Sequence, residues 1–147
     1  MTHVRTQIRD NVATQVTGLA TTGLNVFKTR LYPITANKLP AILVYANSET
    51  NQALAMKHPR LSDRELSLSI EGVAKATTSI EDTLDQIALE IEEAIYSDLT
   101  LGGIAKNVVL SSTDIEISAD GDQPVGGIRL VYLVKYLVRE DDPEVAV

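Results

Sequence analysis

The chain has 147 residues, a formal net charge of −7 and 44% hydrophobic residues, which indicates one globular domain large enough to bury a core. It contains no cysteine, which excludes disulfides, thiolate zinc sites and cysteine nucleophiles. The excess of acids argues against a general nucleic-acid binder. The polar N-terminus argues against a secretory signal, and the absence of a long apolar run argues against a membrane span.

The N-terminal part of the chain predicts one helix and three strands. Val4, Ile8, Val12 and Val16 recur every four positions, which predicts a helix over Thr2–Gly18 with Thr2 as its N-cap. Segments rich in β-branched and apolar residues, separated by a proline-containing linker, predict the strands that follow. These are Asn25–Tyr32, Ala41–Ala46 and Arg64–Ala74, with the linker at Pro33–Pro40.

A long polar segment, Asn47–Asp63, lies between the second and third of these strands. It carries a small apolar patch that includes Leu54 and Met56. A connection of this length without structure of its own is typically functional or disordered, so we expect a long loop here. Alternation in the strand that follows predicts Leu66, Leu68 and Ile70 toward the core and Glu65, Ser67, Ser69 and Glu71 outward.

The segment Ser79–Ser97 has the strongest helical pattern in the chain. Thr78 and Glu81 match a capping box, and Gly102–Gly103 follow after a short turn. The apolar face consists of Ile80, Leu84, Ile87, Ala88, Ile91 and Ala94–Ile95. Beyond this helix, alternation predicts a strand at Val108–Ser118 and a turn at Ala119–Pro124, so the last two strands are expected to form a hairpin.

The last strand, Val125–Arg139, is the segment around which the predicted sheet is organised, and its length and apolar character favour an interior position. On its second face, apolar residues alternate with Arg129, Lys135 and Arg139. We expect Val131 and Leu133 to lie under a helix, and Leu137 to lie near a subunit interface. Its first face is continuously apolar: Ile128, Leu130, Tyr132, Val134, Tyr136 and Val138.

The fold class predicted from this order, α-β-β-β-α-β-β, is α+β. We expect a mostly antiparallel or mixed sheet of about five strands with two helices packed on one face. The whole chain, residues 1–147, forms a single domain in this interpretation. The long loop spans residues 47–63, and the acidic and then apolar tail, residues 140–147, is expected to be flexible.

No convergent set of catalytic groups is visible in the sequence, so no catalytic, cofactor-binding or metal-binding residue is predicted. Neither His3 nor His58 has an acid, base or nucleophile at a spacing typical of catalysis. The carboxylates between Glu81 and Glu93 surround the polar face of the second helix without converging. A solvated helix face is therefore favoured over a hydrolase site.

Four segments resemble the tail terminator proteins of long-tailed bacteriophages, of the minor tail protein U type. They are THVRTQIRDNVATQVTGL, VFKTRLYPITANKLPAILVYANSE, TLGGIAKNVVLSSTDIEIS and the PEVAV ending. The resemblance covers nearly the whole chain and implies a small α/β domain that forms a hexameric ring. It further implies that the ring caps the head-proximal end of the tail tube, stops its polymerisation and binds the neck proteins.

The resemblance implies a structural protein of the virion tail, assembled in the bacterial host cytoplasm. The implied partners are further copies of the chain, the tail tube protein and a neck or head completion protein; DNA passes through the pore without specific binding, and no membrane is involved. Two alternatives remain: another neck or head–tail completion protein, and a small ligand-binding α+β regulatory domain with the long loop as a lid. From exposure arguments, the predicted protein-interface residues are Leu54, Met56, His58, Arg60, Leu137 and Arg139.

Overall fold

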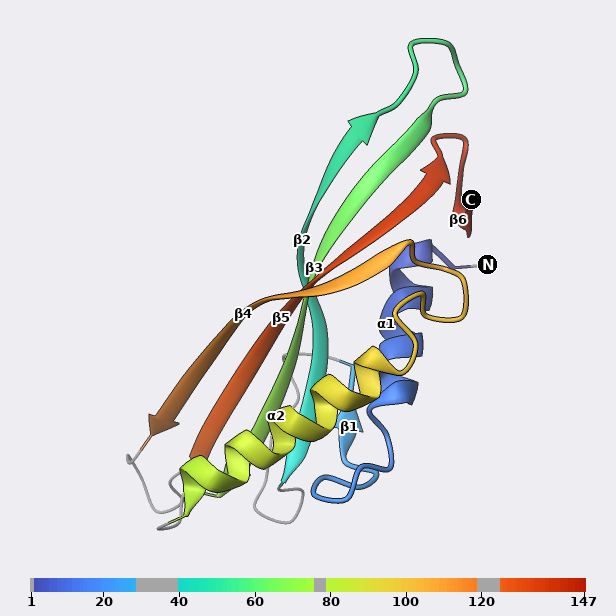
Figure 1. Cartoon of the computed structure of the whole chain (residues 1–147). Helices are drawn as coiled ribbons and strands as arrows, with labels where there is room; N and C mark the ends of the chain where they lie inside the picture. Colours follow the sequence, from blue (N-terminus) through green and yellow to red (C-terminus); the bar gives the residue numbers. More distant parts are fainter. Residues whose placement is uncertain (1, 29–39, 76–78, 119–124) are drawn as a thin grey trace.

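The structure is a computed structural model that describes residues 2–28, 40–75, 79–118 and 125–147. Within these ranges the chain forms two helices and a mixed sheet of six strands, which confirms the predicted α+β class and the order of its elements (Figure 1). The helices are α1 (Val4–Gln15) and α2 (Ile80–Tyr96). The strands are β1 (Val26–Phe27), β2 (Ala41–Ala53), β3 (Leu61–Lys75), β4 (Asn107–Ser118), β5 (Val125–Arg139) and β6 (Asp142–Ala146).

The strands follow the spatial order β1-β2-β3-β5-β4, and β6 pairs with the end of β5. Only β1 is parallel to its neighbour; the other pairs between described strands are antiparallel. The predicted bounds of β5 are those observed, and β5 lies between β3 and β4, inside the sheet as expected. Its antiparallel pairing with β4 confirms the predicted relation of these two strands, while the connecting residues 119–124 lie outside the described residues.

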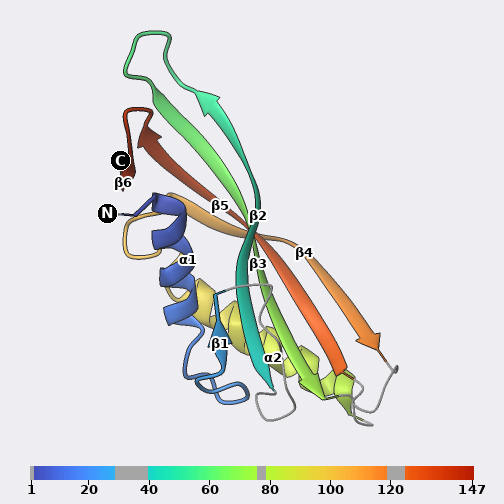
Figure 2. The same cartoon turned by 180° about the vertical axis from the view of Figure 1, so that it is seen from behind.

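Both helices cover the same face of the sheet (Figures 1 and 2). The buried residues of α2 are the predicted Ile80, Leu84, Ile87, Ala88, Ile91 and Ile95, and the apolar face predicted for β5 is buried throughout. Two glycines allow α2 to lie close to the strands. A Cβ atom on Gly72 would come within 2.6 Å of the Ile87 side chain, and one on Gly126 within 2.7 Å of Ile80.

The prediction of a long loop at residues 47–63 is wrong, because most of this segment is strand. β2 continues to Ala53 and β3 begins at Leu61, so residues 54–60 alone connect them. The hairpin segment Asn47–Asp63, called the arm here, projects beyond the helices at the top of Figure 1. Its polar composition reflects strands that are largely open to solvent, which do not need an alternating apolar face.

A β-bulge interrupts each of two strands at the same level of the sheet. The bulge in β2 lies between Ala46 and Ser48, and that in β4 lies between Leu110 and Ser112. Each adds one residue, so side chains beyond it point to the face opposite to the one that regular alternation would give. In β2 the bulge places Glu49 opposite Leu66, on the face that the helices cover.

The flexible tail predicted at residues 140–147 is also contradicted, since it forms a strand. Val138 of β5 pairs with Ala146 of β6, and the backbone N–H of Val147 donates to the carbonyl of Leu137 at 2.8 Å. The side chain of Gln7 in α1 donates to the Glu144 carbonyl at 2.7 Å. The C-terminal residues therefore extend the sheet along the part of β5 that β4 does not reach.

The ends of the helices differ from prediction. His3, rather than Thr2, is the N-cap of α1: its Nδ1 accepts from the backbone N–H of Arg5 at 3.0 Å. α1 ends at Gln15, before Gly18. Ser79 is the N-cap residue of α2 and makes no side-chain cap hydrogen bond, while Thr78 of the predicted capping box lies outside the described residues.

The remaining differences concern strands. β1 covers only Val26–Phe27 of the predicted strand Asn25–Tyr32, whose residues 29–32 lie outside the described residues, as do residues 33–39 of the linker. The prediction that Val131 and Leu133 lie under a helix is wrong. They are partly exposed on the helix-free face, because both helices pack on the opposite side of the sheet.

Candidate interaction surfaces

A cluster of charged side chains joins the base of the arm to α1. The Glu49 carboxylate is 2.5 Å from the Arg5 guanidinium and 3.6 Å from that of Arg64. The Tyr136 hydroxyl also donates to Glu49. The Glu49 and Arg64 side chains are only 7% and 15% exposed, so each depends on the other for compensation of its charge. The cluster therefore fixes the arm to the helical layer.

The electrostatic environment of this cluster suits structure better than proton transfer. Burial, together with the hydrogen bond to Glu49, raises the pKa of the Tyr136 hydroxyl to about 12. Burial and the nearby Arg5 and Arg64 lower the pKa of His3 below 6.5. Both shifts move the pKa further from neutral pH, whereas a general acid or base needs a pKa near the operating pH. Both oxygens of Glu49 are already occupied by described partners.

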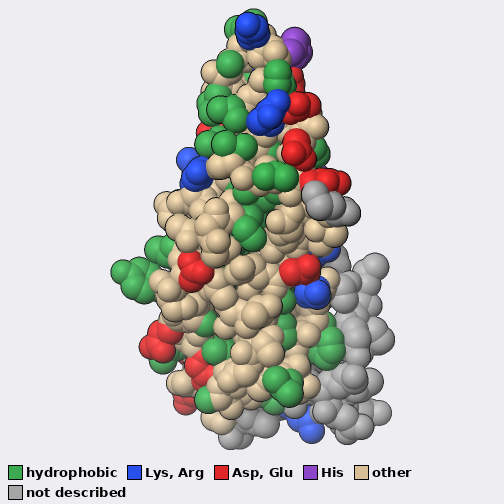
Figure 3. Space-filling view, turned by 90° about the vertical axis from the view of Figure 1, so that its right-hand side faces the viewer, with side chains coloured by type: hydrophobic (Ala, Val, Ile, Leu, Met, Phe, Trp, Pro, Cys, Tyr) green, Lys and Arg blue, Asp and Glu red, His purple; other side chains and the backbone are tan. Residues whose placement is uncertain are grey.

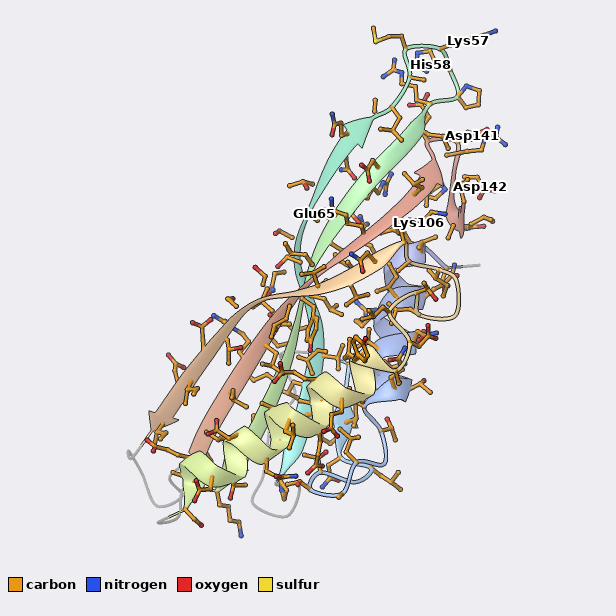
Figure 4. All side chains as sticks on the ribbon, in the orientation of Figure 1. Lys57, His58, Glu65, Lys106, Asp141 and Asp142 are labelled. Atoms are coloured by element: carbon orange, nitrogen blue, oxygen red, sulfur yellow. The ribbon has the colours of Figure 1, made fainter. Side chains whose placement is uncertain are left out.

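The tip of the arm, Leu54–Arg60, presents apolar and basic side chains to solvent. Met56 is 92% exposed and Leu54 is 52% exposed. Lys57 and His58 lie at the same end (Figure 4), and Figure 3 shows hydrophobic, basic and histidine side chains gathered there. Within the described parts of the chain, Lys57 forms no ion pair.

Glu140, just after β5, holds the base of this tip. Its carboxylate accepts from the backbone N–H of Arg60 at 3.0 Å and lies 2.6 Å from His58 Nδ1. These contacts, led by that of the Arg60 backbone, lower the pKa of Glu140 below its ordinary value. Arg60 also directs its guanidinium to His58 Nε2 at 2.8 Å. The tip is thus an ordered turn whose outermost side chains are free to contact a partner.

The helix-free face of the sheet carries both charged and apolar side chains, with a small excess of acids over bases. Ser69 faces this side as predicted, but it is fully buried and accepts a hydrogen bond from Asn47 at 2.7 Å. Arg129 pairs with Asp114 at 3.2 Å, and Lys135 lies 3.7 Å from Glu65. By their register the charged residues of this face are five acids, Asp63, Glu65, Glu71, Asp114 and Glu116, and four bases, Lys75, Arg129, Lys135 and Arg139.

Two shallow hollows lie on this face. One, of about 280 Å³, is lined by Glu71, Asp114, Glu116 and Arg129, where Gly127 leaves space in β5. The other, of about 360 Å³, lies at the base of the arm. Carboxylates line both, and the described residues contain no group of three His, Asp or Glu side chains able to hold a metal ion.

An apolar groove of about 450 Å³ lies on the other side of the molecule, between the C-terminal part of α2 and the beginning of β4. Tyr96 at its rim is 76% exposed, and the Glu92 carboxylate lies at its wall. Burial, reinforced by Glu92, raises the pKa of the Tyr132 hydroxyl in this groove. We call this hollow the α2–β4 groove; its apolar lining includes Tyr96, Leu99, Val108, Leu110 and Tyr132.

The acids of α2 do not form the cleft that a hydrolase would need. Glu81, Asp82, Asp85, Glu92 and Glu93 are exposed along the helix. Glu90 is engaged by the backbone N–H and hydroxyl of Thr21, at 2.9 and 2.5 Å. Burial opposes its ionisation, but the Thr21 hydrogen bonds outweigh this effect and lower the pKa of Glu90 below 4.5.

The structure brings the predicted interface residues into one region. Leu54, Met56, His58 and Arg60 belong to the arm tip, and Arg139 pairs across the sheet with Leu61, next to Arg60. Arg139 is exposed and bound to Asp141 at 3.0 Å. Leu137 lies on the helix-free face, opposite Asp63.

Sequence reasoning missed the Glu49 cluster and the α2–β4 groove. Glu49 was placed in a loop, and its partners Arg5, Arg64 and Tyr136 are far apart in sequence. The groove had a partial signal, because Tyr96 at the end of α2 and Leu99 just after it continue the apolar pattern of the helix. No local pattern indicated that the beginning of β4 would lie beside them.

No protein-family model matches the chain, and no curated protein matches it. No helix among the described residues is long and apolar enough to cross a membrane.

Proposed function

We propose that this chain is a structural subunit of a bacteriophage tail terminator. Copies of it form a ring that caps the head-proximal end of the tail tube, stops tube polymerisation and offers a surface to a neck or head completion protein. The proposal begins from the resemblance, which implies a ring, and assigns no catalytic step to the chain. Its partners are further copies of itself, the tail tube protein and the neck protein, and its place is the virion tail.

The observation that carries the proposal is the composition of the helix-free face. By register this face carries five carboxylates and four Lys or Arg side chains, and Arg139 is further neutralised by Asp141. A wall past which DNA moves should repel phosphates rather than bind them, since each phosphate contact adds affinity. We therefore assign this face to the lumen of the ring and the helical layer to the outside.

The arm fits the second task of such a subunit. It extends beyond the helical layer (Figure 1) and presents Leu54 and Met56 to solvent. Exposed apolar side chains on a projecting element are typical of a surface that becomes covered on assembly. The cluster at Glu49 keeps the base of the arm in place while its tip makes contacts.

Electron microscopy of tails assembled with and without the protein tests the proposal. We expect tubes of uniform length that end in a ring when the purified protein is mixed with polymerising tube protein, and overlong tubes without it. Tubes that continue to grow in the presence of excess protein would contradict the proposal. Tight, salt-sensitive binding to duplex DNA would contradict the assignment of the helix-free face to the lumen.

A further inference from the structure

The exposed apolar side chains of the arm tip have a complementary surface elsewhere on the same molecule. The tip carries Leu54 and Met56, and the α2–β4 groove is lined mainly by apolar side chains. Both surfaces are open in the isolated chain. When apolar side chains enter such a groove, both they and the groove lining are removed from water. This burial of apolar surface is the main favourable contribution to association.

The charges at the two surfaces are also opposite. Lys57 at the tip is exposed and forms no ion pair with a described residue (Figure 4). Glu92 lies at the groove wall, on a helix that contains six acidic residues and neither Lys nor Arg. An ammonium group brought to this wall would meet a negative field, which favours the correct orientation of the two surfaces.

The two surfaces cannot meet within one chain. The register of β2 with β3 is continuous from Ser48 to Ala53, and this pairing holds the tip away from α2 (Figure 1). Contact requires a second molecule, and because tip and groove are different surfaces the contact is heterologous. Repetition of a heterologous contact gives a closed ring or an open filament.

We propose that the arm tip of one copy of this chain binds the α2–β4 groove of a second copy. Leu54 and Met56 pack into the groove against Tyr96 and Leu99, and Lys57 pairs with Glu92. The contact would join neighbours in the ring of the proposed tail terminator, and it rests on that proposal only for the number of copies that close the ring.

Charge exchange between tip and groove provides the test, with mass measured by analytical ultracentrifugation over a range of protein concentrations. In Lys57→Glu alone, an acidic tip faces Glu92, and in Glu92→Lys alone, Lys57 faces another lysine. Each variant should associate about tenfold more weakly than the unmodified protein. In an equimolar mixture of the two, every contact of an alternating assembly pairs opposite charges, so association should return.

Control variants separate this contact from a general effect of charge or folding. Lys75→Glu and Asp85→Lys change the net charge by comparable amounts at exposed positions away from tip and groove, and they should associate normally. Met56→Asp should weaken association on the order of a hundredfold, because a carboxylate would have to enter the groove. Circular dichroism should show all variants folded, since every altered side chain is exposed.

Three results would overturn the proposed contact. They are a protein that stays monomeric up to about 1 mM, variants that associate like the unmodified chain, and a mixture no better than its components. Failure of this contact is distinguishable from failure of the proposed function. Lys57→Glu that caps tails normally refutes the contact alone, whereas a protein that assembles through tip and groove and leaves tubes uncapped refutes the function alone.

Discussion

Replacement of Glu49 by Gln tests whether the cluster at the base of the arm stabilises the fold. The substitution keeps the size of the side chain but removes the charge that compensates Arg64, which is 15% exposed. Removal of one partner of a buried ion pair costs about 3–5 kcal/mol. Arg5 is 42% exposed and can be hydrated instead, so we expect a loss of about 3 kcal/mol, at the lower end of that range.

Thermal unfolding followed by circular dichroism measures this loss. For a chain of 147 residues, about 1 kcal/mol corresponds to roughly 2–4 °C in Tm, so Glu49→Gln should lower Tm by about 6–12 °C. Glu65→Gln is the matched control, because Glu65 is 37% exposed and 3.7 Å from Lys135. Its loss should be about 1 kcal/mol or less.

A double-mutant cycle makes the test independent of this control. Arg64→Gln should remove much of the cost of Glu49→Gln, with a coupling free energy of about 1–3 kcal/mol. Equal losses in Glu49→Gln and Glu65→Gln, or a coupling free energy near zero, would refute the argument that burial makes this cluster stabilising.

Three further predictions follow from the other contacts. The folded-state pKa of Glu90 lies below 4.5, so its contribution is present above pH 4.5 and is lost as the pH falls through that folded-state value. Urea unfolding should show Glu90→Gln less stable at neutral pH, with a difference that shrinks in acid. His3→Ala should cost about 1 kcal/mol of stability above pH 7 through loss of the N-cap. Because the folded-state pKa of His3 lies below 6.5, this cost should decline as the pH falls below 6.5. A cost that is constant with pH would refute the role of the Nδ1 acceptor. Circular dichroism should show Leu133→Asp folded, since Leu133 is partly exposed on the helix-free face. Leu68→Asp, at a fully buried position, should unfold. Unfolding of both variants would contradict the assignment of the two faces.

The elements that could be predicted from the sequence are those with one face buried along their whole length. β5 and α2 show clear periods of two and of about 3.6 residues, because the core covers one side of each. The arm lacked such a signal, since beyond Ser48 both faces of β2 are largely open to solvent. β6 was missed for a related reason: Asp142–Ala146 is short and partly exposed, and its pairing with β5 is set by tertiary context.

The candidate surfaces were predictable to different extents. Exposure arguments predicted Leu54 and Met56 as interface residues in a long loop, and the structure confirms their exposure while correcting the loop to a hairpin. The Glu49 cluster could not be predicted, because it depends on one extra residue in β2 that has no distinctive local sequence. Without that residue, regular alternation would have assigned Glu49 to the helix-free face.

The bulge in β2 restricts how the length of this chain can change during evolution. Deletion of one residue between Ala46 and Glu49 would exchange the two faces of the outer part of β2, moving Glu49 away from Arg64 and turning its neighbours toward the helices. Removal of one residue from each strand at the arm tip would leave all other side chains on their present faces. Natural variants should therefore differ in arm length by such symmetric steps, while the spacing from Ala46 to Glu49 stays constant.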